Sequence, residues 1–313
     1  MSSLEMPWFS DWAFPLSAAL AALGQVVAQP AQPVLAAALA CDPDCLALGA
    51  GVAELVLAIR LSCVSANNRV VMPLAHPWAR LFRGAVTVPH KPSGGLDVPA
   101  LLEAIRKADA EAVVIGVPDP VTGAGLTPLE LELILDGMDG ILIIDGTYQE
   151  FANYDLVEAA ATHDRVILVR PLTLLSQAAP VAFATGSPEL MGAVRETLAP
   201  LPPLLQASVH AWLAQTEVWQ SRLVDVVAAR QALYRGLLQT PGLQVYPSQG
   251  NFLMLRGTAE QVAFLTDAGY PVRGVPFNGP LGDCWQLAVA DAPRCQDLQD
   301  QLLQTLLARS TEG

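Results

Sequence analysis

The chain has 313 residues, of which 52% are hydrophobic and 15% charged. This composition supports one large or two modest folded domains and excludes an intrinsically disordered chain. The net charge is −13, from 17 Lys plus Arg against 30 Asp plus Glu, and the basic residues are scattered singly, so we expect no nucleic-acid partner. Only two lysines occur, Lys91 and Lys107, and any chemistry that needs a lysine must use one of them.

The N-terminal segment is the most membrane-like part of the chain. No charged residue lies between Trp12 and Cys41, but prolines and glutamines interrupt the stretch before it reaches the roughly 20 apolar residues that span a bilayer. Glu5 and Asp11 precede it, where a signal peptide would carry basic residues. We therefore expect a helix, a loop and a second helix, with no membrane insertion. The five irregularly spaced cysteines favour a cytoplasmic location and no metal site.

The middle of the chain alternates short apolar runs with amphipathic stretches. Such runs are typical of parallel strands that are covered on both faces. They lie at residues 70–72, 112–115, 141–144 and 166–169. Between them, 98–108 and 127–135 have helical periodicity, and Thr127-Pro128 with Glu130 forms a good helix start. Strands that alternate with helices predict an α/β fold, a three-layer sandwich around a mostly parallel sheet.

The C-terminal part of the chain has a different pattern. A long helix is predicted from about residue 208 to 237, and Trp212 and Trp219, seven residues apart, would lie on one of its faces. Residues 243–246 and 252–255 indicate strands of a second unit, and 294–308 a terminal helix. These features divide the chain into three parts. They are an N-terminal arm at 1–40, a large α/β domain at 41–238 and a small α+β domain at 239–313.

Three segments carry residues that could bind a ligand. The glycine turn at 48–55 precedes a predicted helix, where backbone N–H groups can bind an anion, although most such turns bind nothing. The loop at 116–126 follows a strand at the edge where α/β proteins bind ligands, or is an ordinary turn. Asp145 directly follows a buried strand and Tyr148 lies near it. Asp145 could hold a protonated ring nitrogen or a metal, or cap the next helix.

In this order, these segments resemble the fold-type I family of pyridoxal-phosphate enzymes, in particular the branch of histidinol-phosphate aminotransferases and threonine-phosphate decarboxylases. The resemblance rests on seven motifs in register. They are 49–55 for the phosphate turn G-N-G-S-D-E-L, 76–78 for P-T-Y, 117–123 for N-P-N-N-P-T-G, 145–148 for D-E-A-Y, 186–190 for the G-S-P-E-L segment, 248–252 for S-x-x-N-F and 272–274 for the V-R segment.

The resemblance implies a role for each matching residue. Ala50, Gly51 and Val52 would bind the cofactor phosphate, and Trp78 would lie against the cofactor ring. Asp145 would pair with the pyridine nitrogen and Tyr148 would approach the ring oxygen; alternatively, Tyr148 fills an emptied pocket. The family builds its pocket between two subunits, so the resemblance also implies a homodimer with a small-molecule ligand.

The chain departs from the family at the lysine on which the chemistry depends. Leu172, or a residue within one or two of it, stands where the family has the lysine that forms an imine with the cofactor. Both Lys91 and Lys107 lie far upstream of this position. A leucine provides neither an amine nor a proton carrier. We therefore expect no catalytic residue of the conventional kind.

Three further positions agree with this loss. Pro180 stands in place of the arginine that holds the phosphate, Pro120 in place of the asparagine beside the ring oxygen, and Gln286 in place of the arginine that binds the substrate carboxylate. Because charge-assisted contacts are lost, pyridoxal phosphate is expected to bind weakly and without a covalent link, or not at all.

The sequence leaves three hypotheses for the function. The first is a pseudoenzyme or binding protein with a reused pocket. The others are a pyridoxal-phosphate-dependent aminotransferase or decarboxylase of phosphorylated amino acids, and an enzyme of altered, imine-independent chemistry. A hydrolase is not expected, because no nucleophile motif occurs and the histidines are dispersed. They lie at His76, His90, His163 and His210.

Overall fold

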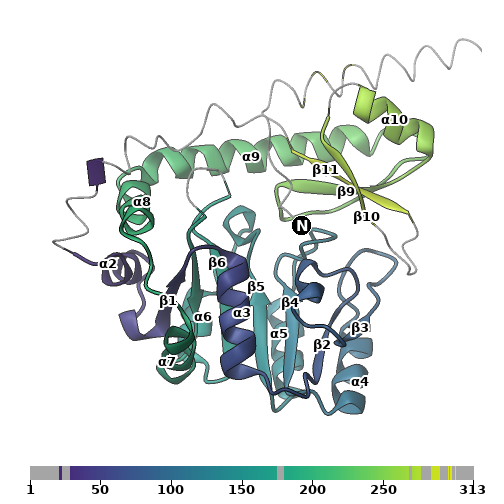
Figure 1. The fold of residues 1–313 in the computed structure, drawn as a ribbon. Coiled ribbons are helices and arrows are strands. Elements are labelled where there is room, and N and C mark those ends of the chain that lie inside the picture. Colours follow the sequence, from purple (N-terminus) through teal and green to yellow (C-terminus); the bar gives the residue numbers. More distant parts are fainter. Residues whose placement is uncertain are drawn as a thin grey trace, which may run out of the picture.

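A computed structural model describes residues 21–22, 29–174, 180–267, 270–275 and 283–289, together with residues 295, 297 and 300. Its larger sheet has seven strands in the order β1-β7-β6-β5-β4-β2-β3 (Figure 1). The strands are β1 (Leu46–Gly49), β2 (Val70–Pro73), β3 (Val86–Val88), β4 (Ala112–Gly116), β5 (Ile141–Asp145), β6 (Val166–Pro171) and β7 (Ala182–Thr185). β3, β2, β4, β5 and β6 are parallel, whereas β7 is antiparallel to both of its neighbours.

Helices cover both faces of this sheet. Side chains of α3 (Val52–Cys63) and α7 (Pro188–Thr197) share one hydrophobic cluster with alternate strand residues such as Ile143 and Ile167. The intervening strand residues, such as Leu142 and Leu168, pack in a second cluster with helices of the other face. These helices are α2 (Ala31–Ala38), α4 (Val98–Ala108), α5 (Pro128–Asp136), α6 (Val157–Thr162) and α8 (Pro203–Leu213). This arrangement confirms the predicted three-layer α/β sandwich.

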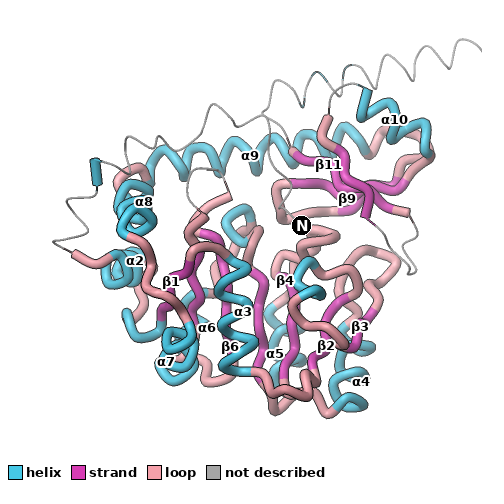
Figure 2. Tube along the Cα trace, in the orientation of Figure 1, coloured by secondary structure: helices cyan, strands magenta, loops and turns pink. Residues whose placement is uncertain are grey.

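A second, four-stranded sheet has the order β10-β11-β9-β8, and all its neighbouring strands are antiparallel. It is formed by β8 (Gln244–Tyr246), β9 (Phe252–Arg256), β10 (Val272–Val275) and β11 (Cys284–Ala288). The long helix α9 (Thr216–Leu237) runs along one edge of the molecule and leads to this sheet, and α10 (Ala259–Asp267) lies beside it (Figure 2). Three short 3₁₀ helices complete the described elements: η2 (Pro43–Cys45), η3 (Pro77–Arg80) and η4 (Gln149–Phe151).

The prediction of a single helix over 208–237 is wrong, because α8 and α9 are separate. The chain leaves helical geometry at Gln215, where φ is −116° and ψ is 22°. The hydroxyl of Thr216 donates to the carbonyl of Leu213 at 2.7 Å and so binds one of the last carbonyls of α8. Trp212 and Trp219 therefore lie on different helices, although both contact the same hydrophobic cluster.

Several predictions for the chain ends are only partly covered. The second predicted N-terminal helix is present as α2, whereas most of the segment before it and most of the predicted helix 294–308 lie outside the described residues. The domain boundaries at 40 and 238 remain a proposal. None of the helices in the described part of the chain is long and apolar enough to cross a membrane.

Candidate functional site

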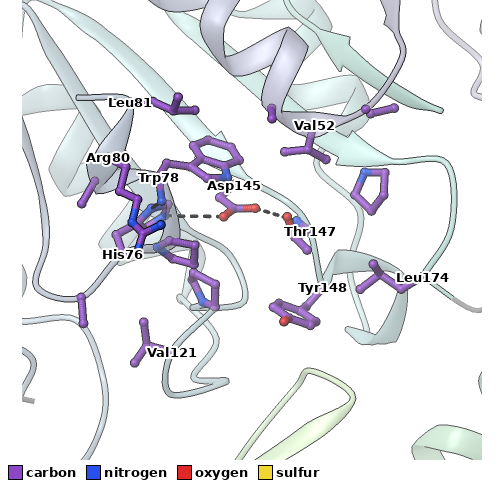
Figure 3. A pocket seen from close by; sticks show the side chains of 18 of the residues that line it. Val52, His76, Trp78, Arg80, Leu81, Val121, Asp145, Thr147, Tyr148 and Leu174 are labelled. Carbon is purple, nitrogen blue, oxygen red and sulfur yellow. Dashed lines mark hydrogen bonds and ion pairs between the residues drawn. The ribbon is translucent and has the colours of Figure 1, made fainter. Parts of the chain in front are cut away.

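A cavity of about 690 Å³ opens at the carboxyl ends of four parallel strands. Residues that follow β2, β4, β5 and β6 line it, and the second sheet closes one side through β10 and β11. The start of α3 and the start of β7 complete the wall. Parallel strands end with their carboxyl edges together, so the topology brings four loops to one place. Figure 3 shows the side chains that point toward this space.

The start of α3 contributes the glycine turn predicted from the sequence. Gly51 has φ +124°, and a Cβ there would lie 3.3 Å from the carbonyl oxygen of Pro180, so glycine allows the two segments to approach. Gly51 and Val52 line the cavity, as does Ala53, which the sequence analysis did not single out. Ala50 is not among the lining residues. Its N–H donates to the carboxylate of Glu54 at 2.5 Å, which places a negative charge at this turn.

The loop after β2 places His76 and Trp78 at the cavity. His76 precedes the 3₁₀ helix η3, and its Nδ1 accepts the backbone N–H of Trp78 at 3.2 Å. The two rings meet edge to face, with centroids 5.3 Å apart. Because Nδ1 is an acceptor in this geometry, the proton of the neutral ring lies on Nε2. Sequence reasoning placed Trp78 near the site but missed the role of His76, whose local signal is a His-Pro pair in the loop three residues after β2.

Asp145 is the last residue of β5, and its side chain is 2% exposed. One carboxylate oxygen, Oδ1, accepts the N–H of Thr147 at 2.9 Å, so Asp145 caps a local turn and not a helix. The other, Oδ2, lies 3.6 Å from Nε2 of His76 (Figure 3). This separation is too long for a hydrogen bond. The site therefore contains an acceptor and a donor that lie side by side without satisfying each other.

Burial shifts both of these groups toward their neutral forms. It raises the pKa of Asp145 from 3.8 to about 7; the N–H of Thr147 opposes this shift, and the nearby carboxylate of Asp119 adds to it. Burial likewise lowers the pKa of His76 from 6.5 to about 4. Although the two side chains are close enough for an ion pair, His76 is neutral at the pH at which Asp145 ionises. We therefore treat them as a polar pair and not as a salt bridge.

Behind this pair lies a second buried Asp–His pair, outside the cavity lining. Nε2 of His90 is 3.0 Å from Oδ2 of Asp119, and Oδ1 of Asp119 accepts the N–H groups of Val121 and Thr122 at 2.9 and 2.8 Å. Burial by itself would raise the pKa of Asp119, but His90 and these N–H groups hold it below its ordinary value. This pair fixes the loop after β4.

Tyr148 lies at the boundary between the cavity and the core below the second sheet. It lines the cavity and is 3% exposed. Its ring packs edge to face on Phe252 of β9, with centroids 5.1 Å apart. Tyr148 therefore joins the floor of the cavity, next to Asp145, to the second sheet.

The end of β6 is where the sequence placed the missing lysine. The side chain of Leu172 packs in the cluster of Leu168 and Val181 and does not line the cavity. Thr173 and Leu174 line it instead, and Leu174 is within the two-residue uncertainty of the alignment. Thr173 and Leu174 therefore face the cavity and Leu172 does not, whereas the position of the family's lysine stays a prediction.

Glu150 holds this segment in place, which the sequence analysis missed. Its buried carboxylate accepts the N–H of Leu174 at 2.5 Å and the hydroxyl of Thr173 at 3.0 Å. Burial raises the pKa of Glu150 to about 7, against the opposing effects of the Leu174 N–H, Arg170 and the Thr173 hydroxyl. Both contacts fix the backbone directly beneath the cavity wall.

Neither lysine lines the cavity. Nζ of Lys91 is 3.5 Å from a carboxylate oxygen of Glu130. Lys107 lies on α4, with Nζ 2.6 Å from Glu103 and a side chain that is 66% exposed. Both amines are thus positioned in ion pairs away from the site.

The three other positions at which the chain departs from the family pattern all lie at the cavity. They are Pro120, Pro180 and Gln286. Gln286 is fully buried, and its Nε2 donates to the carbonyls of Pro120 and Val121 at 2.9 and 2.7 Å. Its Oε1 accepts from the guanidinium of Arg273 on β10. Gln286 thus connects the second sheet to the loop after β4.

Within the described residues, no group of three or more His, Cys, Asp or Glu side chains is arranged to hold a metal ion. The cavity offers a polar floor of Asp145 and His76, two cations at Arg80 and Arg273, aromatic side chains from Trp78 and Tyr148, and an aliphatic wall at Leu174. The arrangement suits a flat ligand with one polar edge.

Known proteins with similar sequences support this description. Residues 75–305 match the family described as aminotransferase class I and II. A histidinol-phosphate aminotransferase of Xanthomonas campestris pv. campestris (strain B100) is 32% identical over 271 residues, 80% of this chain and 75% of that protein. The histidinol-phosphate aminotransferase of Chlorobaculum tepidum is 26% identical over 280 residues, 84% of this chain and 78% of that protein.

Solved structures have the same fold. A histidinol-phosphate aminotransferase from Sinorhizobium meliloti, in complex with pyridoxal-5'-phosphate, has a TM-score of 0.76 at 20% identity, over 92% of this chain and 88% of that one. A decarboxylase from Sulfurospirillum multivorans has a TM-score of 0.75 at 18% identity, over 94% and 93% of the two chains. The chain therefore belongs to the class I and II aminotransferases, in the branch similar to the histidinol-phosphate aminotransferases.

Proposed function

We propose that this aminotransferase-family protein holds a small molecule in its cavity without forming an imine, and is a binding protein or pseudoenzyme and not a conventional transaminase. The observation that carries the proposal is the identity of the side chain at the end of β6. Leu174 faces the cavity there, and both lysines of the chain lie elsewhere in ion pairs. Without an amine at this point, the chain has no group that could form and break the imine.

The residues of the cavity fit one end of pyridoxal phosphate and not the other. Asp145, buried on the floor, suits a protonated ring nitrogen, and Trp78 suits the face of an aromatic ring. At the phosphate end, the turn at 50–54 offers backbone N–H groups but also the carboxylate of Glu54, and Pro180 adds no charge. Since each charge-assisted hydrogen bond contributes roughly 1.5–3 kcal/mol, the lack of a cation at Pro180 weakens binding of the phosphate, and the cations that line the cavity are Arg80 and Arg273.

The cofactor seen in the Sinorhizobium meliloti protein is therefore expected here, if it binds, as a weak and non-covalent ligand. When bound, pyridoxal phosphate would supply an electron sink to a reacting amine. The residues of the cavity fit the ring of this cofactor but neither its phosphate nor its covalent attachment.

One observation favours the alternative of imine-independent chemistry. Asp145 has a pKa of about 7 and lines the cavity, so it could take up or release a proton near neutral pH. A proton acceptor of this kind suits a reaction on a bound small molecule. Turnover of a captured ligand by the purified protein, abolished by Asp145→Asn, would favour this alternative over a binding protein.

The homodimer implied by the resemblance stays part of the proposal. The family builds its pocket between two subunits, so we propose that a second copy of this chain completes the site. Light scattering of the purified protein across a range of concentrations tests this, and a monomer at all concentrations contradicts it.

The test of the proposal uses pyridoxal phosphate and borohydride. The wild-type protein is expected to give no borohydride-fixed adduct, whereas Leu174→Lys, made with Lys91→Met and Lys107→Met, should give one at residue 174. The matched control carries Lys91→Met and Lys107→Met but keeps Leu174. An adduct of the wild-type protein that peptide mapping assigns to Lys91 or Lys107, accompanied by aminotransferase activity, overturns the proposal.

A further inference from the structure

Resting on the proposal that this cavity binds a small molecule, we propose that its occupant is a planar cyclic amide. Such a ring carries an N–H donor directly beside a carbonyl acceptor. The ring N–H would donate to Oδ2 of Asp145, and the ring carbonyl would accept from Nε2 of His76. The inference deepens the proposed function by assigning a ligand class and a second polar contact on the cavity floor.

His76 supplies the first part of the argument. Its side chain is fully buried and lines the cavity. Its Nδ1 accepts the N–H of Trp78, so Nε2 carries the proton. Nε2 makes no hydrogen bond within the described part of the chain. A buried donor without a partner is rare in proteins, and one that faces a cavity indicates that the partner comes from a ligand or a water molecule.

Asp145 supplies the second part. The N–H of Thr147 donates to Oδ1, whereas Oδ2 lies 3.6 Å from Nε2 of His76. The two atoms are too far apart to bond each other but close enough to bond neighbouring atoms of one ligand. The acceptor Oδ2 of Asp145 and the donor Nε2 of His76 are complementary to a ligand that carries a donor beside an acceptor. The N–H and the carbonyl of a cyclic amide form such an edge.

The walls of the cavity define the rest of the ligand. Apolar side chains from several separate segments surround the polar pair, and Trp78 presents an aromatic ring (Figure 3). Val52, Val121 and Leu174 are among the apolar side chains that line the cavity. The aromatic and aliphatic side chains of these walls favour a flat ring, and Arg80 and Arg273 add two cations to the lining.

Two isomeric probes test the proposal. In 2-pyridone the N–H and the carbonyl are adjacent, whereas in 4-pyridone they lie at opposite ends of the ring. Calorimetry should show 2-pyridone binding to the wild-type protein about tenfold more tightly, because only this isomer makes both hydrogen bonds. Larger cyclic amides should displace 2-pyridone from His76 and Asp145.

The decisive variant is His76→Asn, because asparagine keeps an acceptor for the N–H of Trp78 while removing the Nε2 donor. In this variant the ratio of the affinities for 2-pyridone and 4-pyridone should fall from about ten to about one. His163→Asn is the matched control: Nδ1 of His163 accepts the N–H of Arg165 at the same 3.2 Å, and His163 lies outside the cavity. Asp145→Ala is a second variant that should also remove the preference, and circular dichroism checks that each protein is folded.

Three outcomes overturn the proposal. They are equal affinity for the two isomers, a preference that survives in His76→Asn and Asp145→Ala, and no binding of either isomer at millimolar concentration. Each of them leaves the imine-free function standing, because that function is tested by the borohydride adduct. An adduct on a native lysine would overturn the function whatever the pyridone ratio.

Discussion

The molecule contains two buried Asp–His pairs that differ in almost every contact. In the first, Asp119 and His90 are hydrogen-bonded at 3.0 Å, and Asp119 also accepts two backbone N–H groups. In the second, Asp145 and His76 are 3.6 Å apart, and Nε2 of His76 has no hydrogen-bond partner in the part of the chain that the structure describes. The first pair lies behind the wall of the cavity, whereas the second lines it.

This difference separates a structural pair from a binding pair. The contacts of Asp119 hold its pKa below the ordinary value, so its charge stabilises the folded chain. The pKa of Asp145 is raised to about 7, so its charge costs stability. Polar groups that are buried at a cost to folding are characteristic of functional sites. Four substitutions test this contrast.

Asp119→Ala should have the largest effect. The change leaves His90 and the N–H groups of Val121 and Thr122 without their acceptor, and removal of one partner from a buried pair costs about 3–5 kcal/mol. Urea unfolding at pH 7 measures the loss. Asp225→Ala, at an exposed position of α9, is the control and should change little. Equal losses in the two variants would show that Asp119 is not a structural residue.

Asp145→Asn should do the opposite and stabilise the protein. The pKa of Asp145 in the folded protein, about 7, lies above its ordinary value of 3.8. The free energy of unfolding of the wild-type protein is therefore highest below pH 3.8 and falls as the pH rises to 7. Asparagine removes this loss and still accepts the N–H of Thr147. We expect a gain of roughly 2–4 kcal/mol at pH 8 and little gain at pH 4, measured by urea unfolding. A gain that does not depend on pH contradicts the assignment.

Gln286→Leu tests the loop next to Asp119. The carbonyls of Pro120 and Val121 would lose their donor in a buried place, which is expected to lower the free energy of unfolding by about 2 kcal/mol. Gln244→Leu, on the exposed face of β8, is the matched control. If both variants unfold at the same urea concentration, the second sheet is not held to this loop through Gln286.

His76→Asn should show the smallest effect, and only at acidic pH. The folded pKa of about 4 lies below the ordinary 6.5, so the wild-type protein loses stability as the pH falls from 6.5 toward 4. The variant lacks this loss. The free energy of unfolding of the variant minus that of the wild type should therefore be about 1 kcal/mol higher at pH 5.5 than at pH 7.5. Thermal unfolding at both pH values measures it, beside His163→Asn. The same difference at both pH values would contradict a buried, neutral His76.

Local sequence patterns predicted the frame of the fold. The apolar runs at 112–115 and 141–144 became β4 and β5, and the Thr127 cap with Glu130 begins α5 as expected. Such features depend on near neighbours in the chain. The break between α8 and α9 was missed, because helical periodicity continues through Gln215 and only the local backbone geometry interrupts it.

The candidate site was predictable where the local sequence marks it. Asp145 directly follows a predicted strand, Gly51 and Val52 lie in the glycine turn before a predicted helix, and the resemblance supplied Trp78. His76 and Glu150 were missed, because their significance comes from partners that lie far away in the sequence. His76 meets Asp145 across 69 positions, and Glu150 meets Leu174 across 24. No local pattern records such pairs.

The amino-acid sequence alone showed that this chain has only two lysines, Lys91 and Lys107. It also determined the alternation of strands and helices, since periodicity is a local property. Only the tertiary structure decided that Leu174, and not Leu172, faces the cavity, and that His76 and Asp145 meet there. The physical reason is that the direction of a side chain at a strand end, and the burial that shifts its pKa, are set by the segments packed around it.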